Sequence, residues 1–293
     1  MKETVIEIKN LKKYYGKQRG IKDVSFSVQE GDIFGFIGPN GAGKSTTIRT
    51  LLALLKPTSG SATIFGKDCV DHASDIAGDI GYLSGEPSYY ENMKVKEFLG
   101  YSAELYGKKN SSRLEELAER LQLDLNRKIE DLSMGNKKKV GIVSALLHSP
   151  RLLILDEPTS GLDPLMQQIF FDILKEENTK GTTILFSSHV LSEVQKLCDK
   201  VAIIKEGEII DIKSITELRN NGYKKVSLVT DNPLGKEELD FDGVADVNIT
   251  GNSTSFIYMG SVTDLLYKIN SFKVRDVFIE EPTLEEIFLH YYQ

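Results

Sequence analysis

The chain has 293 residues, of which 27% are charged, and its formal net charge is −7. A chain of this length can bury a full core in one large domain with a small one, or in two modest domains, which excludes a disulfide-stapled miniprotein. The negative charge and the absence of a long Lys/Arg block leave no footprint for the phosphates of nucleic acid. We therefore expect no nucleic-acid partner.

The sequence predicts neither a membrane helix nor an export signal. Apolar runs such as 51–55, 140–147 and 152–155 are far shorter than the roughly 20 residues that a membrane helix needs. The first five residues of the chain include an acid, Glu3, and no apolar segment of the kind found in export signals. Its cysteines, Cys69 and Cys198, lie far apart and in no metal-ligand spacing, which suits a reducing compartment. We therefore expect a protein that stays in the cytoplasm.

Short β-rich runs alternate with helical patterns from residue 4 to about residue 215. This alternation is typical of a mostly parallel sheet that is covered by helices. The runs 33–37, 152–155 and 183–186 are almost continuously apolar, as strands buried on both faces should be. A glycine-rich turn and a helix follow the first of these runs, and the helix is predicted to end before Lys56-Pro57.

A helical segment interrupts this alternation between about residues 86 and 147. Apolar residues recur there at helical spacing in two stretches, Val95 to Leu105 and Leu114 to Leu121. A third helix is predicted to begin near Ser133 and to bury apolar residues between Val140 and Leu147. The lysines 137–139 near its start are interpreted as a solvated helix face.

The pattern changes again after residue 218. One helix is predicted near 263–269, and strands are predicted at 226–229, 247–250, 255–259 and 274–279. A last helix is predicted to open at Pro282-Thr283 with the spacing of a capping box. We therefore expect two domains, 1–218 and 219–293, of which the second is a small α+β unit.

The strongest local signal is the segment from Gly38 to Ser45, which matches GxxxxGK[ST] between a predicted strand and a predicted helix. Glycines keep Cβ atoms away, so that backbone N–H groups and the helix N-terminus can approach a polyphosphate. Lys44 is predicted to bridge to the γ-phosphate, and Ser45 to hold Mg²⁺. The residues expected to bind the nucleotide are Gly38, Pro39, Asn40, Gly41, Ala42, Gly43, Lys44, Ser45 and Thr46.

Two acids follow the apolar run 152–155, at the edge where open α/β sheets bind their ligands. Asp156 is predicted to hold Mg²⁺. Glu157 is predicted to orient and deprotonate the water that attacks the γ-phosphate. His189 follows the run 183–186, and we expect it at the same edge as a donor that stabilises developing charge.

The class of phosphate-loop protein is narrowed by the segment Leu132-Ser133-Met134-Gly135-Asn136. It resembles the LSGGQ signature of ABC ATPases, although Met134 replaces a glycine and Asn136 replaces a glutamine. Together with the phosphate loop and the acids, it makes residues 4 to 215 similar to the ATPase domain of ABC transporters. The resemblance implies an α/β, RecA-like P-loop NTPase fold, in which antiparallel β and helical subdomains accompany a mostly parallel sheet.

The resemblance implies that two chains share each ATP. Ser133 and Gly135 of one copy would contact the γ-phosphate bound by the other copy, and Asp163 lies in Ser160–Pro164, which resembles the D-loop that links the two sites. Tyr15, with Tyr14 as the alternative, would lie under the adenine ring. The implied cofactors are ATP and Mg²⁺. The implied partners are a second copy in a head-to-tail dimer and separately encoded membrane permease subunits, so that the chain would lie peripherally on the inner face of the cell membrane.

Two further segments refine the resemblance. Gly85 stands where family members usually carry a glutamine that touches Mg²⁺ and the water, so that role is assigned to no residue of this chain. The segment 281–290 resembles the ending of ABC-2 type exporter ATPases, whose appended domain is thought to help the ATPase subunits associate. This implies an exporter, and a dimerisation or regulatory role for residues 219–293.

Two other functions remain open. A non-transport ABC ATPase that acts on ribosomes or DNA usually carries two cassettes in one chain or a long coiled coil, and the sequence contains neither. A regulatory subunit that binds ATP with weak turnover is compatible with Gly85, Met134 and Asn136.

Overall fold

The structure, a computed structural model, describes residues 2–16, 18–107, 111–220 and 223–281. The chain falls into two compact units, Met1–Ile212 and Lys213–Gln293. The expected division after residue 218 lies inside helix α8 (Ile215–Asn220), which belongs to the second unit. The helix expected to open at Pro282 lies outside the described residues.

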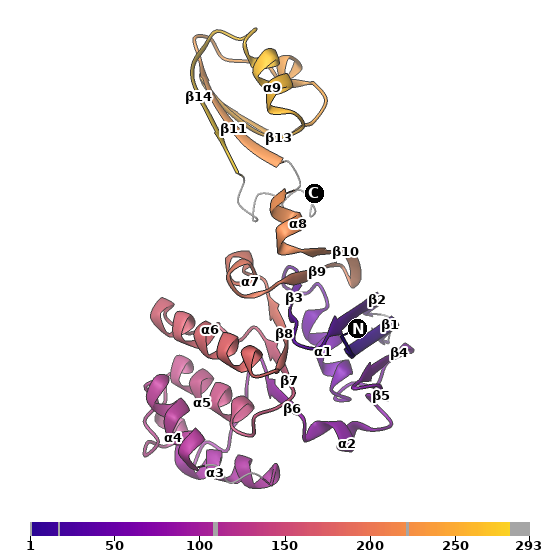
Figure 1. Cartoon of the computed structure of the whole chain (residues 1–293), viewed down its shortest axis with the longest axis vertical. Helices are drawn as coiled ribbons and strands as arrows, with labels where there is room; N and C mark the ends of the chain where they lie inside the picture. Colours follow the sequence, from indigo (N-terminus) through magenta and orange to yellow (C-terminus); the bar gives the residue numbers. More distant parts are fainter. Residues whose placement is uncertain (1, 17, 108–110, 221–222, 282–293) are drawn as a thin grey trace. The chain divides into compact units, whose positions relative to one another are not determined.

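A ten-stranded sheet forms the framework of the first unit, as far as its residues are described (Figure 1). Its strands are β1 (Thr4–Tyr15), β2 (Gln18–Gln29), β3 (Ile33–Ile37), β4 (Ser59–Ile64), β5 (Lys67–Asp68), β6 (Ile80–Leu83), β7 (Leu152–Asp156), β8 (Thr183–Ser188), β9 (Lys200–Lys205) and β10 (Glu208–Ser214). They run in the order β5-β4-β1-β2-β10-β9-β3-β8-β7-β6. Strands β9, β3, β8, β7 and β6 pair in parallel, whereas β1, β2, β4 and β5 form an antiparallel arm. This combination confirms the predicted fold class.

The central strands are buried along their whole length. Every residue of β3, β7 and β8 is buried. In β3, the ring of Phe34 stacks on Phe26 of β2, and the ring of Phe36 lies tilted against it. Strands with both faces covered favour continuous apolar sequence over alternation, which is why these runs were predictable. The helices of this unit are α1 (Lys44–Leu51), α2 (Ala73–Ala77), α3 (Val95–Leu105), α4 (Ser111–Arg120), the 3₁₀ turn η1 (Ile129–Asp131), α5 (Met134–Leu146), α6 (Pro164–Thr179) and α7 (Leu191–Leu197). No helix among the described residues of the chain has the length and apolar character needed to span a membrane.

Helix α1 is shorter than predicted. It ends at Leu51 instead of continuing to Lys56-Pro57. Ala53 adopts a left-handed φ of 55°, and the N–H groups of Leu54 and Leu55 both donate to the carbonyl of Arg49. This turn satisfies a carbonyl at the helix end, so the chain leaves the helix before it reaches the proline.

In the second unit, the described residues form a four-stranded antiparallel sheet in the order β12-β13-β11-β14. The elements are α8, β11 (Tyr223–Thr230), the 3₁₀ turn η2 (Lys236–Leu239), β12 (Val244–Thr250), β13 (Ser253–Met259), α9 (Val262–Ile269) and β14 (Val274–Glu280). Leu265 and Ile269 of α9 pack in one core with Val226, Leu228 and Phe256 of the sheet. The predicted strands and helix are confirmed, with ends that extend the predicted ranges.

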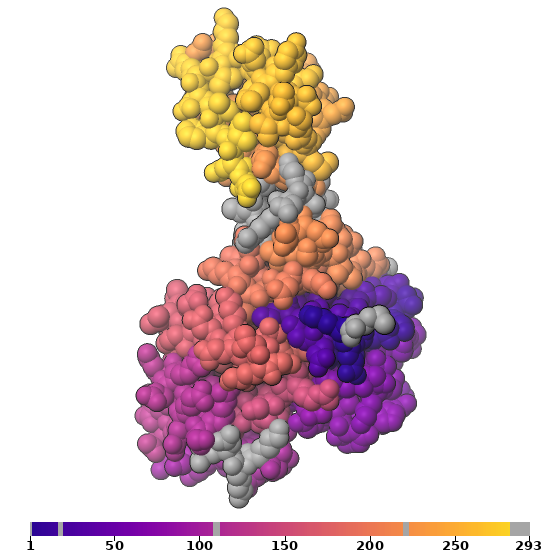
Figure 2. All heavy atoms as spheres, viewed as in Figure 1, coloured from indigo at the N-terminus to yellow at the C-terminus, as the bar shows by residue number. Residues whose placement is uncertain are grey.

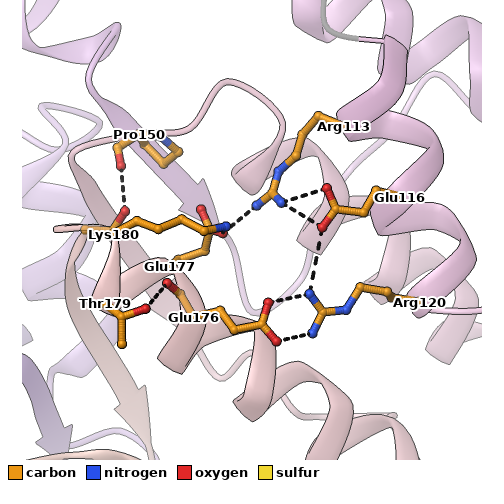
Figure 3. Close-up of polar contacts among 9 residues, drawn as sticks. Arg113, Glu116, Arg120, Pro150, Glu176, Glu177, Thr179 and Lys180 are labelled. Atoms are coloured by element: carbon orange, nitrogen blue, oxygen red, sulfur yellow. Dashed lines mark hydrogen bonds and ion pairs between the residues drawn. The ribbon is translucent and has the colours of Figure 1, made fainter.

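The predicted helical insert is present as α3, α4 and α5, and two arginines of α4 bind it to α6 (Figure 3). An Nη atom of Arg113 lies 2.6 Å from the carboxylate of Glu177, and Arg113 also donates to Glu116 at 3.0 Å. Arg120 donates twice to the carboxylate of Glu176, at 2.6 and 2.7 Å. The side chains of Arg113 and Glu177 are 9% and 4% exposed, whereas those of Arg120 and Glu176 are 28% and 48% exposed. In the space-filling view, atoms of the insert lie directly against those of the α6 region (Figure 2).

The two ion pairs should differ in their effect on stability. Replacing Arg113 by Ala is expected to lower the free energy of unfolding by about 2 kcal/mol, because the buried carboxylate of Glu177 loses its arginine and is left with its ion pair to Lys180. Arg120→Ala is the matched control, and it is expected to cost less than about 1 kcal/mol because its pair is more exposed. Urea unfolding followed by circular dichroism measures both, and equal losses would contradict the distinction.

Candidate functional site

The segments singled out by the sequence converge at one edge of the parallel sheet. Strands β3, β8 and β7 are adjacent and parallel, so their carboxyl ends lie side by side. The phosphate loop leaves β3, Glu157 follows β7, and His189 follows β8. Ligands of open α/β sheets bind at this edge. The geometry therefore assembles one site from residues that are far apart in the sequence.

The loop after β3 is shaped for the close approach of a phosphate. Gly41 and Gly43 have φ angles of 81° and 114°, a region that glycine enters without steric cost. A Cβ atom at Gly38 would collide with the carbonyl oxygen of Ile204. The loop runs directly into α1, whose first residue is Lys44, so that the unpaired N–H groups of the helix start lie at the loop. The Nζ atom of Lys44 donates to the carbonyl of Gly38 at 2.6 Å.

A cavity of about 230 Å³ lies beside this loop. It is lined by Tyr15, Gly20, Asn40, Gly41, Gly43, Lys44, Ser45, Thr46 and Glu157. The predicted residues Gly38, Pro39 and Ala42 do not line it. The carbonyls of Gly38 and Pro39 accept hydrogen bonds from Lys44, and Ala42 is buried.

Gly20 is a cavity residue that the sequence did not reveal. A Cβ atom there would lie 3.0 Å from the ring of Tyr15 and 2.7 Å from the carbonyl oxygen of Lys13. Glycine at this position therefore leaves room for the ring of Tyr15, which is 45% exposed at the cavity. No motif marks Gly20, because the contact forms only after β1 and β2 have paired.

The carboxylate of Glu157 connects the phosphate loop to the end of β8. Its Oε1 atom lies 3.2 Å from Nζ of Lys44, and its Oε2 atom lies 2.7 Å from Nδ1 of His189. Glu157 has a left-handed φ of 47°, which is uncommon for a residue other than glycine. Such backbone outliers cluster at functional sites. A carboxylate held in this way beside a phosphate cavity has the geometry of a general base.

Asp156 is placed to hold a divalent cation. Its side chain is buried, its Oδ1 atom accepts from Oγ of Ser187 at 3.2 Å, and the hydroxyl of Ser45 also donates to it. Burial raises the pKa of Asp156, and the two hydrogen bonds act against that rise. Within the described ranges, no group of three or more His, Cys, Asp or Glu side chains could hold a metal ion. One carboxylate and one hydroxyl suit Mg²⁺, which takes few protein oxygens and completes its shell with water and substrate phosphates.

Three residues are expected to contact the nucleotide bound by a second copy, and none of them lines the phosphate-loop cavity of its own chain. They are Ser133, Gly135 and Asp163. Ser133 and Asp163 are helix N-caps, and the side chain of each accepts a hydrogen bond from the backbone N–H three residues later. A Cβ atom at Gly135 would lie 2.5 Å from the carbonyl oxygen of Gly161, so this glycine is needed within the chain as well. Met134, which lies between Ser133 and Gly135 in the sequence, is 79% exposed.

One interpretation of the sequence is wrong, because Lys138 does not lie on a solvated helix face. It is 3% exposed, and its Nζ atom donates to the carbonyls of Gly85 at 2.7 Å and Glu157 at 3.2 Å. Burial lowers the pKa of Lys138, and the carboxylate of Asp156 is the strongest of the charges that oppose this shift. Its neighbour Lys137 instead forms an ion pair with Glu91.

The sequence contains a signal that Lys138 is buried, namely the helical spacing between Lys138 and the residues that follow it. Gly141, Ile142 and Ala145 follow it at three, four and seven residues, and all of them are buried in α5. Residues at this spacing share one face of a helix. The three consecutive lysines concealed the signal, because a run of like residues looks uniformly polar.

A phosphate loop at the start of a helix, with an Asp-Glu pair at the end of a nearby parallel strand, defines a P-loop nucleoside triphosphatase. The ABC transporter family matches residues 21–160. The chain is 36% identical to the bacitracin transport ATP-binding protein BcrA of Bacillus licheniformis, across 98% of this chain and 96% of that protein. It is 31% identical to the linearmycin resistance ATP-binding protein LnrL of Bacillus subtilis, across 98% of this chain and 97% of that protein. The chain belongs to the ABC transporter family, and it is an ATP-binding subunit with ATPase activity.

Solved structures of ABC ATPases share the fold. The structure of an ATP-binding subunit of an ABC transporter matches with a TM-score of 0.69 and 33% identity, covering 74% of this chain and 92% of that chain. A dimeric bacterial ABC transporter cassette matches with a TM-score of 0.65 and 25% identity, covering 72% of this chain and 98% of that chain.

Replacing Asp156 by Asn should separate catalysis from stability. ATP turnover with Mg²⁺ is expected to fall at least about a hundredfold, because an amide lacks the charge that the cation needs. In EDTA, the free energy of unfolding is expected to rise, or to fall by less than about 1 kcal/mol, because the amide avoids the cost of burying a carboxylate. Steady-state ATPase assays and urea unfolding in EDTA measure the two effects. A loss of several kcal/mol in EDTA would show that the carboxylate is needed for folding.

Proposed function

We propose that this chain powers an exporter by hydrolysing Mg-ATP at two composite sites, each shared between two copies. The observation that carries the proposal is the carboxylate of Glu157, which lies between Lys44 and His189 at the phosphate-loop cavity. A carboxylate in that position can accept a proton from the water that attacks the γ-phosphate.

Each side chain of the site then has a distinct role. Lys44 and the N–H groups at the start of α1 bind the phosphates. His189 orients Glu157 and donates to the charge that develops on the transferred phosphoryl group. Ser45 and Asp156 would hold Mg²⁺, which when bound neutralises phosphate charge. Tyr15, at the cavity rim, stacks on the adenine.

The second copy supplies what the cavity of one chain lacks. Ser133, Gly135 and Asp163 lie outside that cavity, and Ser133 with Met134 is exposed at the start of α5. The N-terminus of α5 has unpaired N–H groups and the positive end of the helix dipole, both of which suit the γ-phosphate bound by a partner copy. The solved structure of a similar cassette is dimeric. A head-to-tail pair would therefore complete both sites.

Transport itself requires partners beyond this chain. We propose that the path for the substrate lies in separate permease subunits and that this chain docks peripherally on them at the inner membrane face, because the chain belongs to the ABC transporter family and resembles subunits named as ATP-binding proteins. The direction of transport is proposed from relatives named for bacitracin transport and linearmycin resistance. Residues 219–293 are proposed to help the two copies associate.

A second candidate is a regulatory subunit that binds ATP and turns it over slowly. The absence of a side chain at Gly85 beside Asp156, and the exposed Met134 in the signature segment, favour this reading. Steady-state ATPase activity with and without the permease separates the two functions. Turnover that stays negligible in both assays would support the regulator.

Glu157→Gln tests the assignment of the general base. Turnover is expected to fall at least about a hundredfold, because an amide cannot accept the proton, while ATP still binds. The unhydrolysed ATP should then hold two copies together, so size-exclusion chromatography with Mg-ATP should show a dimer. Unchanged turnover without a trapped dimer would contradict the assignment.

Mixing two inactive variants tests whether the signature acts across the dimer. Lys44→Ala and Ser133→Ala chains are each expected to be nearly inactive alone. Random pairing should give mixed dimers that contain one intact site, and therefore about a quarter of the wild-type rate. If Ser133 acts within its own chain, every site in the mixture is defective and no activity returns.

A further inference from the structure

Lys138 is a buried cation whose contacts lie on the backbone of two loops at the nucleotide site. Its Nζ atom donates to the carbonyls of Ser84 at 3.4 Å, Gly85 at 2.7 Å and Glu157 at 3.2 Å. The residue is 3% exposed, so water competes little for these bonds. Hydrogen bonds from a charged donor are about twice as strong as neutral ones. Lys138 therefore links its own helix to two loops that are distant from it in the sequence.

The joined parts come from three elements. Lys138 lies in the second turn of α5, the helix that Ser133 caps. Gly85 lies in the loop after β6, and Glu157 lies in the loop after β7. Because β6 and β7 pair in parallel, their loops leave the sheet side by side, and the ammonium group bridges them.

The bond to Glu157 falls on a residue with an unfavourable backbone conformation. Glu157 has a left-handed φ of 47°, and its carbonyl also accepts from Oγ of Ser160 at 3.2 Å. A left-handed conformation costs free energy in a residue other than glycine and persists only where neighbouring contacts enforce it. The backbone conformation of Glu157 determines where its side chain starts and points, and this side chain contacts Lys44 and His189.

We propose that Lys138 is a positioning residue that fixes the backbone of Glu157 and links it to the signature helix and to the Gly85 loop. The inference rests on the proposed role of Glu157 as the general base. Lys138 does not line the phosphate-loop cavity, so it would act through the placement of the carboxylate. A shift of α5 caused by a partner's nucleotide at Ser133 is then transmitted to the base through one side chain.

The test compares two neighbouring lysines in the full-length chain. Lys138→Met keeps a long unbranched side chain and removes the charged donor. We expect kcat to fall about 10- to 100-fold, while KM for ATP changes less than about threefold, because a misplaced base affects chemistry more than binding. Lys137→Met removes the neighbouring charge and its ion pair with Glu91, and it should stay within about twofold of wild type.

A double variant separates positioning from a general structural role. In a Glu157→Gln background, Lys138→Met should lower the residual single-turnover rate less than about twofold, because the base it positions is already gone. A reduction by the same factor as in wild type would overturn the inference. So would a kcat for Lys138→Met equal to that of Lys137→Met.

Folding is checked by circular dichroism and by binding of a fluorescent ATP analogue. If Lys138→Met does not fold, Lys138→Gln takes its place, because glutamine keeps an N–H donor without the charge. The kcat of Lys138→Gln should also fall, but by a smaller factor than that expected for Lys138→Met. If Glu157→Gln itself retains turnover, the proposed base is wrong. If Glu157→Gln is inactive and the Lys138 variants are fully active, only the positioning role is wrong.

Discussion

Negative charge at the end of a buried strand is the constraint on which the rest of this site depends. Asp156 and Glu157 follow β7, and a polyphosphate would add further charge beside them. Carboxylates at low exposure are costly unless cations and donors surround them. Lys44 forms an ion pair with the Glu157 side chain, and Lys138 donates a hydrogen bond to the Glu157 carbonyl. The parallel sheet makes this balance possible, because it delivers all these groups to one edge.

The first two turns of helix α5 have different surroundings. Its start, capped by Ser133, is exposed and suited to a nucleotide held by a partner copy. Its second turn carries Lys138 into the interior, where it contacts the loops of Gly85 and Glu157. The insert that carries α5 is held to α6 through the buried pair of Arg113 and Glu177. The proposed dimer contact and the proposed catalytic carboxylate are therefore connected through one helix.

The similarity to BcrA and LnrL extends beyond the ATPase domain into the second unit. BcrA and LnrL align across 98% of this chain, so their similarity includes most of residues 213–293, whereas the matched solved structures cover 74% and 72% of it. The unit has its own core, in which α9 packs on the antiparallel sheet. An independent core allows such a unit to be appended without change to the nucleotide site.

The sequence by itself determined the phosphate loop, the Asp156-Glu157 pair, the buried strands and the capped start of α5. Each of these is encoded by adjacent residues or by a short period, so local physics suffices to read it. Only the tertiary structure decided the burial of Lys138, the need for Gly20 and the early end of α1. Lys138 meets Glu157 across 19 residues and Ser84 across 54. Contacts at such separations exist only after the strands have paired, and for that reason a run of three lysines concealed one that belongs to the interior.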